Sequence, residues 1–517
     1  MFKKLLVANR GEIALRVMRT CREMGIATVA VYSEADRSGL HVRYADEAYL
    51  LGPGTPGESY LNVRRVMDVA KRCGAEAIHP GYGFLAENPS FVGACERARI
   101  VFVGPTSRTM RVLGDKIAAR RLAIEAGVPV VPGAEDASSC EEALAAADRL
   151  GYPVLVKAVS GGGGKGIRIV ASHSEMEAAL RIAGSEAASA FGDHKLYVEK
   201  FLDNVRHVEV QFLADAHGGI VALGERECSV QRRHQKLVEE SPSPAVDASL
   251  RERLCAAAIA VARAARYRNA GTAEFLLQGD GRFYFLEINA RLQVEHPVTE
   301  LVTGIDLVAE QLRIASGEGL SLGQEDVELR GWAMECRIAA EDPFRDFLPS
   351  LGRVDYVSQP AGPGIRVDSA LFAGIDIPYY YDPMIAKVLA WGHDRAEAIR
   401  RMQRALAEFV VVGVDTNIPL HLQLLRDPRF LAGEVHTTFL EREFTVAPAG
   451  DDEGRQAALL AAAVLAHRRE KQVRAAISTR DGSAWKAHRR LGAMRGGEAA
   501  RSRSPSSGEA SWRRHTD

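Results

Sequence analysis

Polar residues occupy every second position from residue 287 to residue 295, and apolar residues lie between them. In an extended chain, side chains two positions apart project from the same face of a strand. The pattern therefore predicts a strand whose one face presents five polar groups of different chemistry, namely Glu287, Asn289, Arg291, Gln293 and Glu295. Solvation alone does not require such variety, so we interpret this face as a binding or catalytic surface rather than as an exposed amphipathic hairpin.

A hairpin is expected to bring a second strand beside this one. Residues 272–277 combine the β-branched and aromatic side chains that are typical of strands. Asp280-Gly281 is a dipeptide favoured in two-residue type I′ turns. Such a turn pairs Gly279 with Arg282.

This pairing places Glu274 directly opposite Glu287. Two directly opposed carboxylates destabilise a sheet, unless a cation lies between them. Carboxylate oxygens and the amide oxygen of Asn289 are ligands suited to Mg²⁺ or Mn²⁺, and substrate phosphates commonly complete a shell that has few protein ligands. The sequence therefore predicts a divalent metal site on the hairpin.

The overall charge excludes some classes of partner. The chain has 517 residues and a formal net charge of −1, so neither nucleic acid nor an anionic membrane is an expected partner.

Its seven cysteines are scattered without a Cys-x-x-Cys pair, which favours a reducing compartment over a disulfide framework or a zinc site. The apolar run at the start ends before Asn9, too soon for a signal peptide. No stretch approaches the roughly 20 apolar residues of a membrane span, and we expect a cytoplasmic protein.

The order of predicted elements indicates several segments, and the length suggests about three domains. In the first segment strands and helices alternate, as in a parallel sheet built from βαβ units. We expect its strands at residues 4–8, 28–33, 77–79 and 100–103 and its helices at 12–24, 68–73 and 91–98. No Gly-x-Gly-x-x-Gly follows the first strand, so a dinucleotide site is not supported. The predicted boundaries are 1–114, 115–203, 204–446 and 447–517, the last with a helix at 456–467 and a disordered end from residue 501.

A glycine loop joins two strands expected at residues 154–158 and 166–170. Its four glycines, 161–164, let backbone N–H groups approach phosphate oxygens closely, and Lys165 adds positive charge. Because glycine follows this lysine, the loop is not a Walker A motif; the alternative is a flexible linker. Lys157, with apolar residues on both sides, is costly to bury without a counter-ion such as a nucleotide phosphate. Lys116 is a weaker candidate, for which a surface lysine is the alternative.

Residues 225–236 are dense in hydrogen-bonding side chains, with acidic, basic, glutamine and histidine residues mixed together. A solvated charge run is the usual explanation for such a segment. The mixture also suits an anionic polar substrate, and the segment alone does not decide between the two.

These motifs, taken together, resemble those of biotin carboxylase, of the ATP-grasp superfamily. The resemblance rests on the hairpin through Pro297, the glycine loop, the Arg-Arg-His-Gln-Lys run 232–236, and the segments 8–14 and 79–88. It covers residues 2–444, and it departs from the family at Ala339, where asparagine is common. It implies an α/β fold: an ATP-grasp with an N-terminal parallel α/β (pre-ATP-grasp) domain, a lid that carries the glycine loop within 115–203, and a C-terminal biotin carboxylase domain.

The resemblance also implies a reaction and a set of site residues. Biotin held on a carrier protein would be carboxylated with ATP and bicarbonate through carboxyphosphate, and the lid would close to exclude water. The ATP site would use Lys116, Lys157, Gly163, Gly164, Glu199, Lys200, Phe201, Leu202, His207, Gln231 and His234. Two Mg²⁺ or Mn²⁺ ions would be held by Glu274, Glu287 and Asn289. Bicarbonate would lie against Lys236, Arg291, Gln293 and Val294, with Glu295 as the base and Arg337 stabilising the enolate-like oxygen of biotin.

The partners and the final acceptor are left open by the residues. The expected partners are a biotin carboxyl carrier protein, carboxyltransferase subunits and a second copy of the chain in a homodimer. No Ala-Met-Lys-Met biotin-attachment motif occurs, and the nearest string is Gly492-Ala-Met-Arg495. An acyl-CoA carboxylase, such as the acetyl-CoA enzyme of fatty acid biosynthesis, is the first interpretation. The alternatives are a pyruvate or 2-oxo acid carboxylase, another ATP-grasp ligase, and a catalytically silent nucleotide-binding scaffold.

Overall fold

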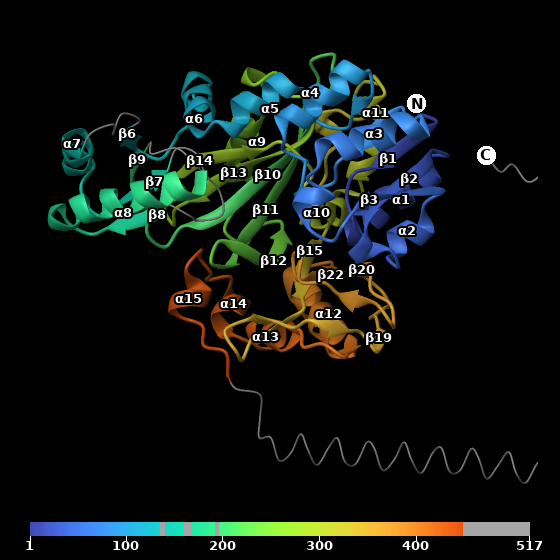
Figure 1. Ribbon diagram of the computed structural model, residues 1–517. Helices are drawn as coiled ribbons and strands as arrows, with labels where there is room; N and C mark the ends of the chain where they lie inside the picture. Colours follow the sequence, from blue (N-terminus) through green and yellow to red (C-terminus); the bar gives the residue numbers. More distant parts are fainter. Residues whose placement is uncertain (135–139, 159–166, 192–195, 448–517) are drawn as a thin grey trace, which may run out of the picture. The chain divides into compact units, whose positions relative to one another are not determined.

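The computed structural model describes residues 1–134, 140–158, 167–191 and 196–447 (Figure 1). The glycine loop lies outside these residues, and so do the helix expected at 456–467 and the disorder expected after residue 500. Among the described residues, no helix has the length and apolar character needed to cross a membrane.

The first segment is a five-stranded parallel sheet in the order β3-β2-β1-β4-β5. Its strands are β1 Lys4–Val7, β2 Ala27–Ser33, β3 Glu47–Gly52, β4 Ala77–His79 and β5 Val101–Phe102. Its helices are α1 Gly11–Glu23, α2 Leu40–Tyr44, α3 Val63–Cys73, α4 Pro89–Ala98 and α5 Ser107–Gly114. The parallel α/β fold predicted for this segment is confirmed.

Local signals explain where the helices of this segment begin and end. Asn62 caps α3 by accepting from the backbone N–H of Arg65 at 3.1 Å. Gly74, at φ +69°, ends the same helix in the left-handed conformation that favours glycine. Strand β3 was not predicted, because it is a short edge strand in which exposed and partly buried residues alternate.

The next segment contains a four-stranded antiparallel sheet in the order β6-β9-β7-β8. Its elements are α6 Lys116–Glu125, β6 Gly133–Ala134, α7 Cys140–Leu150, β7 Val154–Ala158, β8 Ile167–Val170, α8 His173–Phe191 and β9 Leu196–Lys200. Strand alternation gives this sheet two different faces. Val154 and Val156 pack against α7 and α8 in one apolar cluster, whereas Lys157 lies on the opposite face.

The longest sheet has eight antiparallel strands in the order β14-β13-β10-β11-β12-β15-β22-β20. Their bounds are β10 Arg206–Ala214, β11 Ile220–Arg232, β12 Gln235–Ser241, β13 Asn269–Leu277, β14 Phe283–Asn289, β15 Trp332–Ala339, β20 Ile365–Ser369 and β22 Met384–Gly392. The helices of this region are α9 Ala248–Ala264, α10 His296–Thr303, α11 Leu307–Ala315, α12 Arg395–Glu408, α13 Ile418–Leu424, α14 Pro428–Ala432 and α15 Phe439–Arg442. Short strand pairs complete it: β16 Glu341–Asp342 with β17 Leu348–Pro349, β18 Gly352–Arg353 with β21 Asp376–Ile377, and β19 Tyr356–Ser358 with β23 Val410–Val412.

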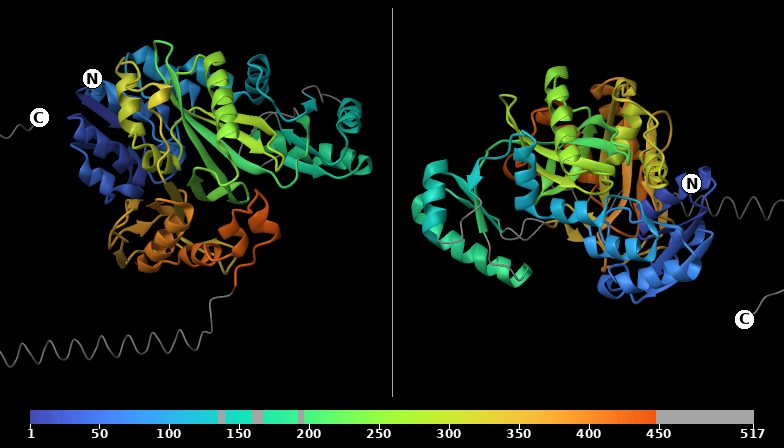
Figure 2. Two further views of the ribbon diagram at one scale, coloured as in Figure 1. Left: turned by 180° about the vertical axis from the view of Figure 1, so that it is seen from behind. Right: turned by 90° about the horizontal axis from the view of Figure 1, so that it is seen from above.

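The two faces of the eight-stranded sheet also differ. On β10, Val208, Val210 and Phe212 pack in one apolar cluster with the helix α9, which lies across the sheet in Figure 2. The residues that alternate with them, His207, Glu209 and Gln211, face the other way. The same alternation on β15 and β22 sends apolar residues toward α12 and leaves charged residues on the other face. The sheet therefore has one face that packs in an apolar core and another on which buried polar and charged residues gather.

The hairpin of β13 and β14 corrects one prediction and confirms another. The turn pairs Gln278 with Arg282, whose backbone groups bond at 2.9 Å, so the predicted pairing of Gly279 with Arg282 was wrong. A bulge then shifts the register by one residue between Glu274 and Phe275. The two one-residue offsets cancel, and Glu274 pairs with Glu287 as predicted.

Candidate active site

A row of charged residues crosses four adjacent strands of the eight-stranded sheet. Glu287 of β14 pairs with Glu274 of β13, which pairs with Glu209 of β10, which pairs with Arg226 of β11. Glu209 and Arg226 are fully buried, and Glu274 is 5% exposed. Three carboxylates in directly opposed positions repel one another, so the row requires positive charge from its surroundings.

Lys236 supplies part of that charge. Its Nζ contacts three carboxylates, at 2.6 Å from Glu209, 3.0 Å from Glu274 and 2.6 Å from Glu295. Burial acts to lower the pKa of Lys236, but these carboxylates outweigh it and hold the pKa well above its ordinary value. Lys236 is therefore a cation at neutral pH.

Arg226 balances the other end of the row. Its guanidinium bonds Glu209 at 2.5 Å and Gln211 at 2.9 Å, and it also donates to Thr299 at 3.0 Å. Because the side chain is fully buried, every one of these partners is needed to offset the loss of water.

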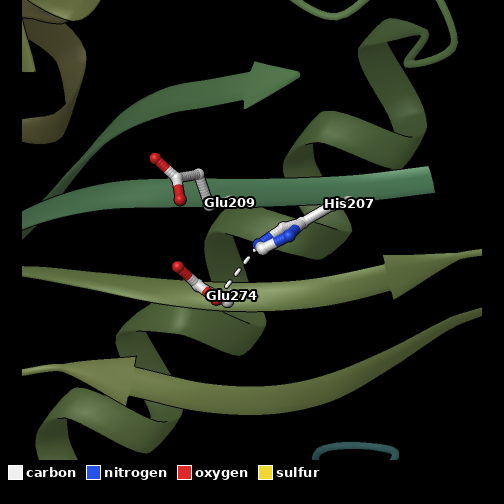
Figure 3. Close-up of side chains that lie close together, drawn as sticks. All are labelled: His207, Glu209 and Glu274. Atoms are coloured by element: carbon white, nitrogen blue, oxygen red, sulfur yellow. Dashed lines mark ion pairs between the residues drawn. The ribbon is translucent and has the colours of Figure 1, made fainter. Parts of the chain in front are cut away.

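His207 lies beside the same carboxylates. Its Nε2 is 3.0 Å from Glu274 Oε2, and Figure 3 shows His207 and Glu209 of β10 beside Glu274 of β13. Gln231 donates its Nε2 hydrogen to His207 Nδ1 at 2.8 Å. This bond leaves the Nε2 hydrogen to face Glu274.

The pKa values of the opposed carboxyl groups are shifted in opposite directions. Burial acts to raise the pKa of Glu274, but Lys236 and His207 outweigh it and hold the pKa far below its ordinary value. Burial, followed by the charge of Glu274, raises the pKa of Glu287. A divalent cation between the two relieves this repulsion. Asn289, whose amide donates to Glu274 at 2.8 Å, adds an oxygen of the kind Mg²⁺ and Mn²⁺ prefer. The donor set fits such a metal.

The polar residues after β14 do not lie on a continued strand, so that prediction was wrong. The strand ends at Asn289, and Glu295 has φ −79° and ψ 8° at the start of α10. The loop between them still brings the predicted side chains together. Arg291 donates to Gln293 Oε1 at 2.8 Å and to Asn289 Oδ1 at 3.3 Å.

Arg337 reaches this loop from β15. Its Nη2 lies 2.9 Å from Glu295 Oε2 and 2.5 Å from Glu239 Oε1. Glu295 is fully buried, and burial acts to raise its pKa. Lys236, Arg337 and Arg226 outweigh burial and hold the pKa of Glu295 well below its ordinary value. Glu295 is therefore an ionised carboxylate between two cations.

A pocket between the two antiparallel sheets lies next to the hairpin carboxylates. Its lining includes Lys116, Lys157 and Glu199 from the second segment and Glu287 from the hairpin. Lys157 Nζ lies 2.5 Å from Glu199 Oε2, so this lysine meets a carboxylate of its own chain as its counter-ion. The structure thus brings together nucleotide-site candidates that are distant in sequence.

The remaining predicted residues that the structure describes are not in the lining of this pocket. Lys200 Nζ donates to Gly151 O at 2.8 Å, and Phe201 N donates to Pro153 O at 3.2 Å, so both connect the end of β9 to the loop before β7. Leu202 follows them after the end of β9. His234, at φ +64°, is exposed in the turn between β11 and β12. Gly163 and Gly164 lie outside the described residues.

Val294 and Ala339 have partners that the sequence did not indicate. The carbonyl of Val294 accepts from Lys387 at 2.8 Å. Asn417 accepts from the backbone N–H of Ala339 at 2.9 Å and donates to the carbonyl of Arg337 at 3.0 Å. An asparagine amide therefore bonds the backbone beside the position where this chain has alanine.

Sequence reasoning missed several charged residues of the site. Glu209 lies between two valines in a strand, and a charge in such a buried position indicates an oppositely charged partner. The sequence alone does not identify that partner as Arg226, because the identification depends on the pairing of β10 with β11. Glu87, in the segment 79–88, accepts from the Arg291 guanidinium at 3.1 Å. Glu239 binds Arg337 from the neighbouring strand.

Three protein-family models match the chain. They are "Biotin carboxylase, N-terminal domain" over residues 1–110, "Carbamoyl-phosphate synthase L chain, ATP binding domain" over 115–322, and "Biotin carboxylase C-terminal domain" over 335–442. Biotin carboxylase 1 of Bacillus subtilis is 54% identical over 443 residues, which are 85% of this chain and 98% of that protein. The chain belongs to the biotin carboxylase family. It is accordingly an ATP-dependent ligase with the ATP-grasp fold.

Other members of the biotin carboxylase family match over the same part of the chain. A pyruvate carboxylase subunit of Methanothermobacter thermautotrophicus is 53% identical over 85% of this chain and 90% of its own length. A crystal structure of the biotin carboxylase–βγ-ATP complex from Campylobacter jejuni superposes with a TM-score of 0.84 at 44% identity, covering 86% of this chain and 99% of that one. The biotin carboxylase domain dimer of Hydrogenobacter thermophilus 2-oxoglutarate carboxylase, solved with MgADP, ADP and bicarbonate, gives a TM-score of 0.82 at 47% identity, over 85% and 97% of the two chains.

Proposed function

We propose that this biotin carboxylase uses ATP and bicarbonate to carboxylate biotin held on a separate carrier protein, as the first half-reaction of an acyl-CoA carboxylase. The observation that carries this proposal is the convergence of Lys236, Arg337 and Glu295 beside the loop that bears Arg291. An ionised carboxylate between two cations, next to a further guanidinium group, suits an anion that must lose a proton.

The nucleotide is assigned to the pocket between the two sheets. Lys116 and Lys157 line it and would meet the phosphates. His207, Gln231, His234 and the hinge from Glu199 to Leu202 complete the proposed ATP site. Bound Mg²⁺ or Mn²⁺, held by Glu274, Glu287 and Asn289, supplies neutralisation of phosphate charge during γ-phosphoryl transfer.

Bicarbonate is assigned to the loop 290–295. The planar guanidinium of Arg291 matches planar bicarbonate in two-pronged geometry, and Gln293, Val294 and Lys236 surround the same space. Glu295 accepts the proton of the bicarbonate hydroxyl group, and the oxygen of that group attacks the γ-phosphate of ATP. The products are carboxyphosphate and ADP. As Lys236 turns toward the bound anion, Glu295 loses one of its cations and becomes a stronger base.

Biotin is assigned to the Arg337 side of the site. Carboxyphosphate breaks down to CO₂ and phosphate, and the released phosphate takes the proton from biotin N1′. Arg337 then stabilises the enolate-like oxygen of the deprotonated ureido ring. Closure of the second segment, residues 115–203, excludes the water that would otherwise consume carboxyphosphate.

The final acceptor and the partners are proposed from the relatives of the chain. We propose acetyl-CoA or another acyl-CoA as the final acceptor, with a carrier protein and carboxyltransferase subunits as partners, in the cytoplasm. The human relative named propionyl-CoA carboxylase alpha chain, 50% identical over 85% of this chain and 61% of its own length, favours an acyl-CoA. The relative from pyruvate carboxylase supports a 2-oxo acid as the second candidate. A homodimer is proposed because the 2-oxoglutarate carboxylase domain was solved as a dimer. The segment boundaries at residues 114, 203 and 446 remain predictions.

The test is ADP release by the purified protein with free biotin as the carboxyl acceptor. We expect release to require both bicarbonate and biotin, and to stop when either is omitted. Release driven by a different carboxylate without biotin would indicate another ATP-grasp ligase. Incubation of the carboxylated carrier with its transferase and with acetyl-CoA, propionyl-CoA or pyruvate then identifies the acceptor.

A further inference from the structure

Lys387 is a fully buried lysine in β22 whose side chain points to the bicarbonate loop. Its Nζ donates to the carbonyl of Val294 at 2.8 Å. Two carboxylates lie farther away, Glu12 of α1 at 3.4 Å and Asp368 of β20 at 3.9 Å. The hydrogen bond to the peptide is therefore the shortest polar contact of the ammonium group.

The charge on Lys387 is maintained despite burial. Burial acts to lower its pKa, but Glu12, Glu335 and Asp368 outweigh it and raise the pKa above its ordinary value. A charged donor makes a stronger hydrogen bond than a neutral one. The hydrogen bond from Lys387 therefore holds the Val294 carbonyl strongly.

The loop has its carbonyls bonded one after another. Arg291 Nη1 donates to Leu292 O at 3.3 Å, His296 Nδ1 lies 2.8 Å from Gln293 O, and Lys387 bonds Val294 O. The first two partners belong to the loop or to the helix that follows it. Lys387 alone of the three comes from a distant strand, so it fixes the loop relative to the C-terminal part of the sheet.

That strand also neighbours the one that carries Arg337. Lys387 of β22 and Arg337 of β15 are directly paired residues in the antiparallel sheet. The paired strands β15 and β22 thus carry both the guanidinium proposed to face biotin and the lysine that bonds the peptide proposed to face bicarbonate.

We propose that Lys387 is a positioning residue that sets the Val294 peptide, and with it Gln293 and Glu295, against bicarbonate. This inference rests on the proposed assignment of bicarbonate to the loop 290–295. Lys387 does not touch the substrate; it acts through the backbone that does. A displacement of about 1 Å in a catalytic geometry is enough to cost on the order of 10²-fold in rate.

The test compares Lys387→Met with Asp368→Asn in the full-length protein. Methionine keeps the length of the side chain and removes the bond to Val294. Asp368→Asn removes a neighbouring buried charge but leaves that bond in place. We expect Lys387→Met to raise the bicarbonate KM about 10-fold or more while the ATP KM changes less than about two-fold. We expect Asp368→Asn to lower the melting temperature and leave the bicarbonate KM within about two-fold.

A purely structural lysine gives a different result. In that case both substitutions lower the melting temperature and the fraction of active protein, and the bicarbonate KM stays unchanged in both, which would overturn the proposal. If Lys387→Met does not fold, the double substitution Glu12→Gln with Lys387→Met removes the carboxylate left without its partner, and the same KM comparison applies. Wild-type protein that shows no bicarbonate-dependent ATP cleavage would overturn the proposed function together with this inference, whereas an active wild type with an unaltered variant overturns the inference alone.

Discussion

At the scale of single residues, the site is a balance of buried charges. Lys236 touches three carboxylates, and Glu295 touches both Lys236 and Arg337. Removing one member leaves its partner charged and without water, which costs far more than the pair contributes. Substitutions in this group therefore separate catalytic effects from stability effects only when the replacement keeps the shape.

Glu295→Gln keeps the shape of the side chain and removes the proposed base. We expect ATP affinity within a few-fold of wild type and bicarbonate-dependent turnover slower by about 10²–10⁴, the usual range for a positioned base. Steady-state ADP release at varied ATP and bicarbonate measures both quantities. Unchanged turnover would remove Glu295 from that role.

Arg226→Leu removes the guanidinium that offsets Glu209. Because both side chains are fully buried, we expect a loss of about 3–5 kcal/mol in the free energy of unfolding. The matched control is Arg282→Ala, whose ion pair with Asp280 is exposed and should contribute less than about 1 kcal/mol. Urea denaturation of both variants tests this, and equal losses would contradict the assignment of Arg226 to the buried row.

At the scale of elements, the hairpin shows how far the sequence leads. The alternation of residues and the Asp280-Gly281 turn located both strands and predicted the pairing of Glu274 with Glu287. The predicted turn was off by one residue and the bulge was not predicted, and these two offsets cancel. Bulges depend on how a strand meets its neighbours, which a single segment does not reveal. The polar side chains after Asn289 converge through a loop, because α10 begins at His296 and ends the extended chain. The partners Arg226, Glu239 and Lys387 come from strands whose order only the folded sheet defines.

Glu287→Ala tests the metal assignment of the hairpin. We expect a higher Mg²⁺ concentration for half-maximal activity, because Glu274 and Asn289 remain but one charged ligand is lost. Titration of activity with Mg²⁺ at saturating ATP is the measurement. An unaltered metal dependence would mean that the opposed carboxylates do not share a cation.

The pairing of β12 with β15 predicts a pH effect on stability. Glu239 and Glu335 are directly opposed and fully buried. Burial raises the pKa of Glu335 well above its ordinary value, Glu239 and Glu295 add to this effect, and Lys387 and Arg337 oppose it. Burial likewise raises the pKa of Glu239 to about 7, against the pull of Arg337.

A carboxyl with a raised folded pKa stabilises the fold below its unfolded pKa of about 4.3 and loses that contribution as pH rises through the folded pKa. Glu335→Gln mimics the protonated acid. We therefore expect its melting temperature to exceed that of wild type increasingly as pH rises above about 4.3 toward the raised folded pKa of Glu335. Thermal unfolding across this range measures the difference, and parallel curves for the two proteins would contradict it.

At the scale of the whole molecule, the site is assembled from distant segments. Glu12 and Glu87 come from the N-terminal α/β segment, in α1 and in the loop before α4, Lys157 comes from the four-stranded sheet, and Arg337 and Lys387 come from the last part of the long sheet. The resemblance of motifs gave the fold and the residue types, because the motifs mark the loops and strands of that fold. The contacts between segments follow from tertiary packing, which no local pattern encodes.

Deletion of residues 448–517 tests what lies beyond the site. Every assigned residue precedes this segment, so we expect carboxylation of free biotin to remain within about two-fold of wild type. Parallel measurements of free-biotin turnover, melting temperature and co-elution with partner subunits distinguish the outcomes. Loss of turnover with a lower melting temperature would place the segment in the enzyme core, whereas loss of co-elution alone would assign it to assembly.

The direct pairing of Arg337 with Lys387 has a consequence for the distance between the two substrates. Lys387, proposed to position the peptide at bicarbonate, and Arg337, proposed to face biotin, arise from neighbouring strands, whose axes are held about 4.8 Å apart by backbone hydrogen bonds. With these proposed assignments, the backbone of the sheet sets the separation between the two substrate positions. We therefore expect substitutions in the surrounding helices to alter the rest of the site more than the spacing between the proposed bicarbonate and biotin positions.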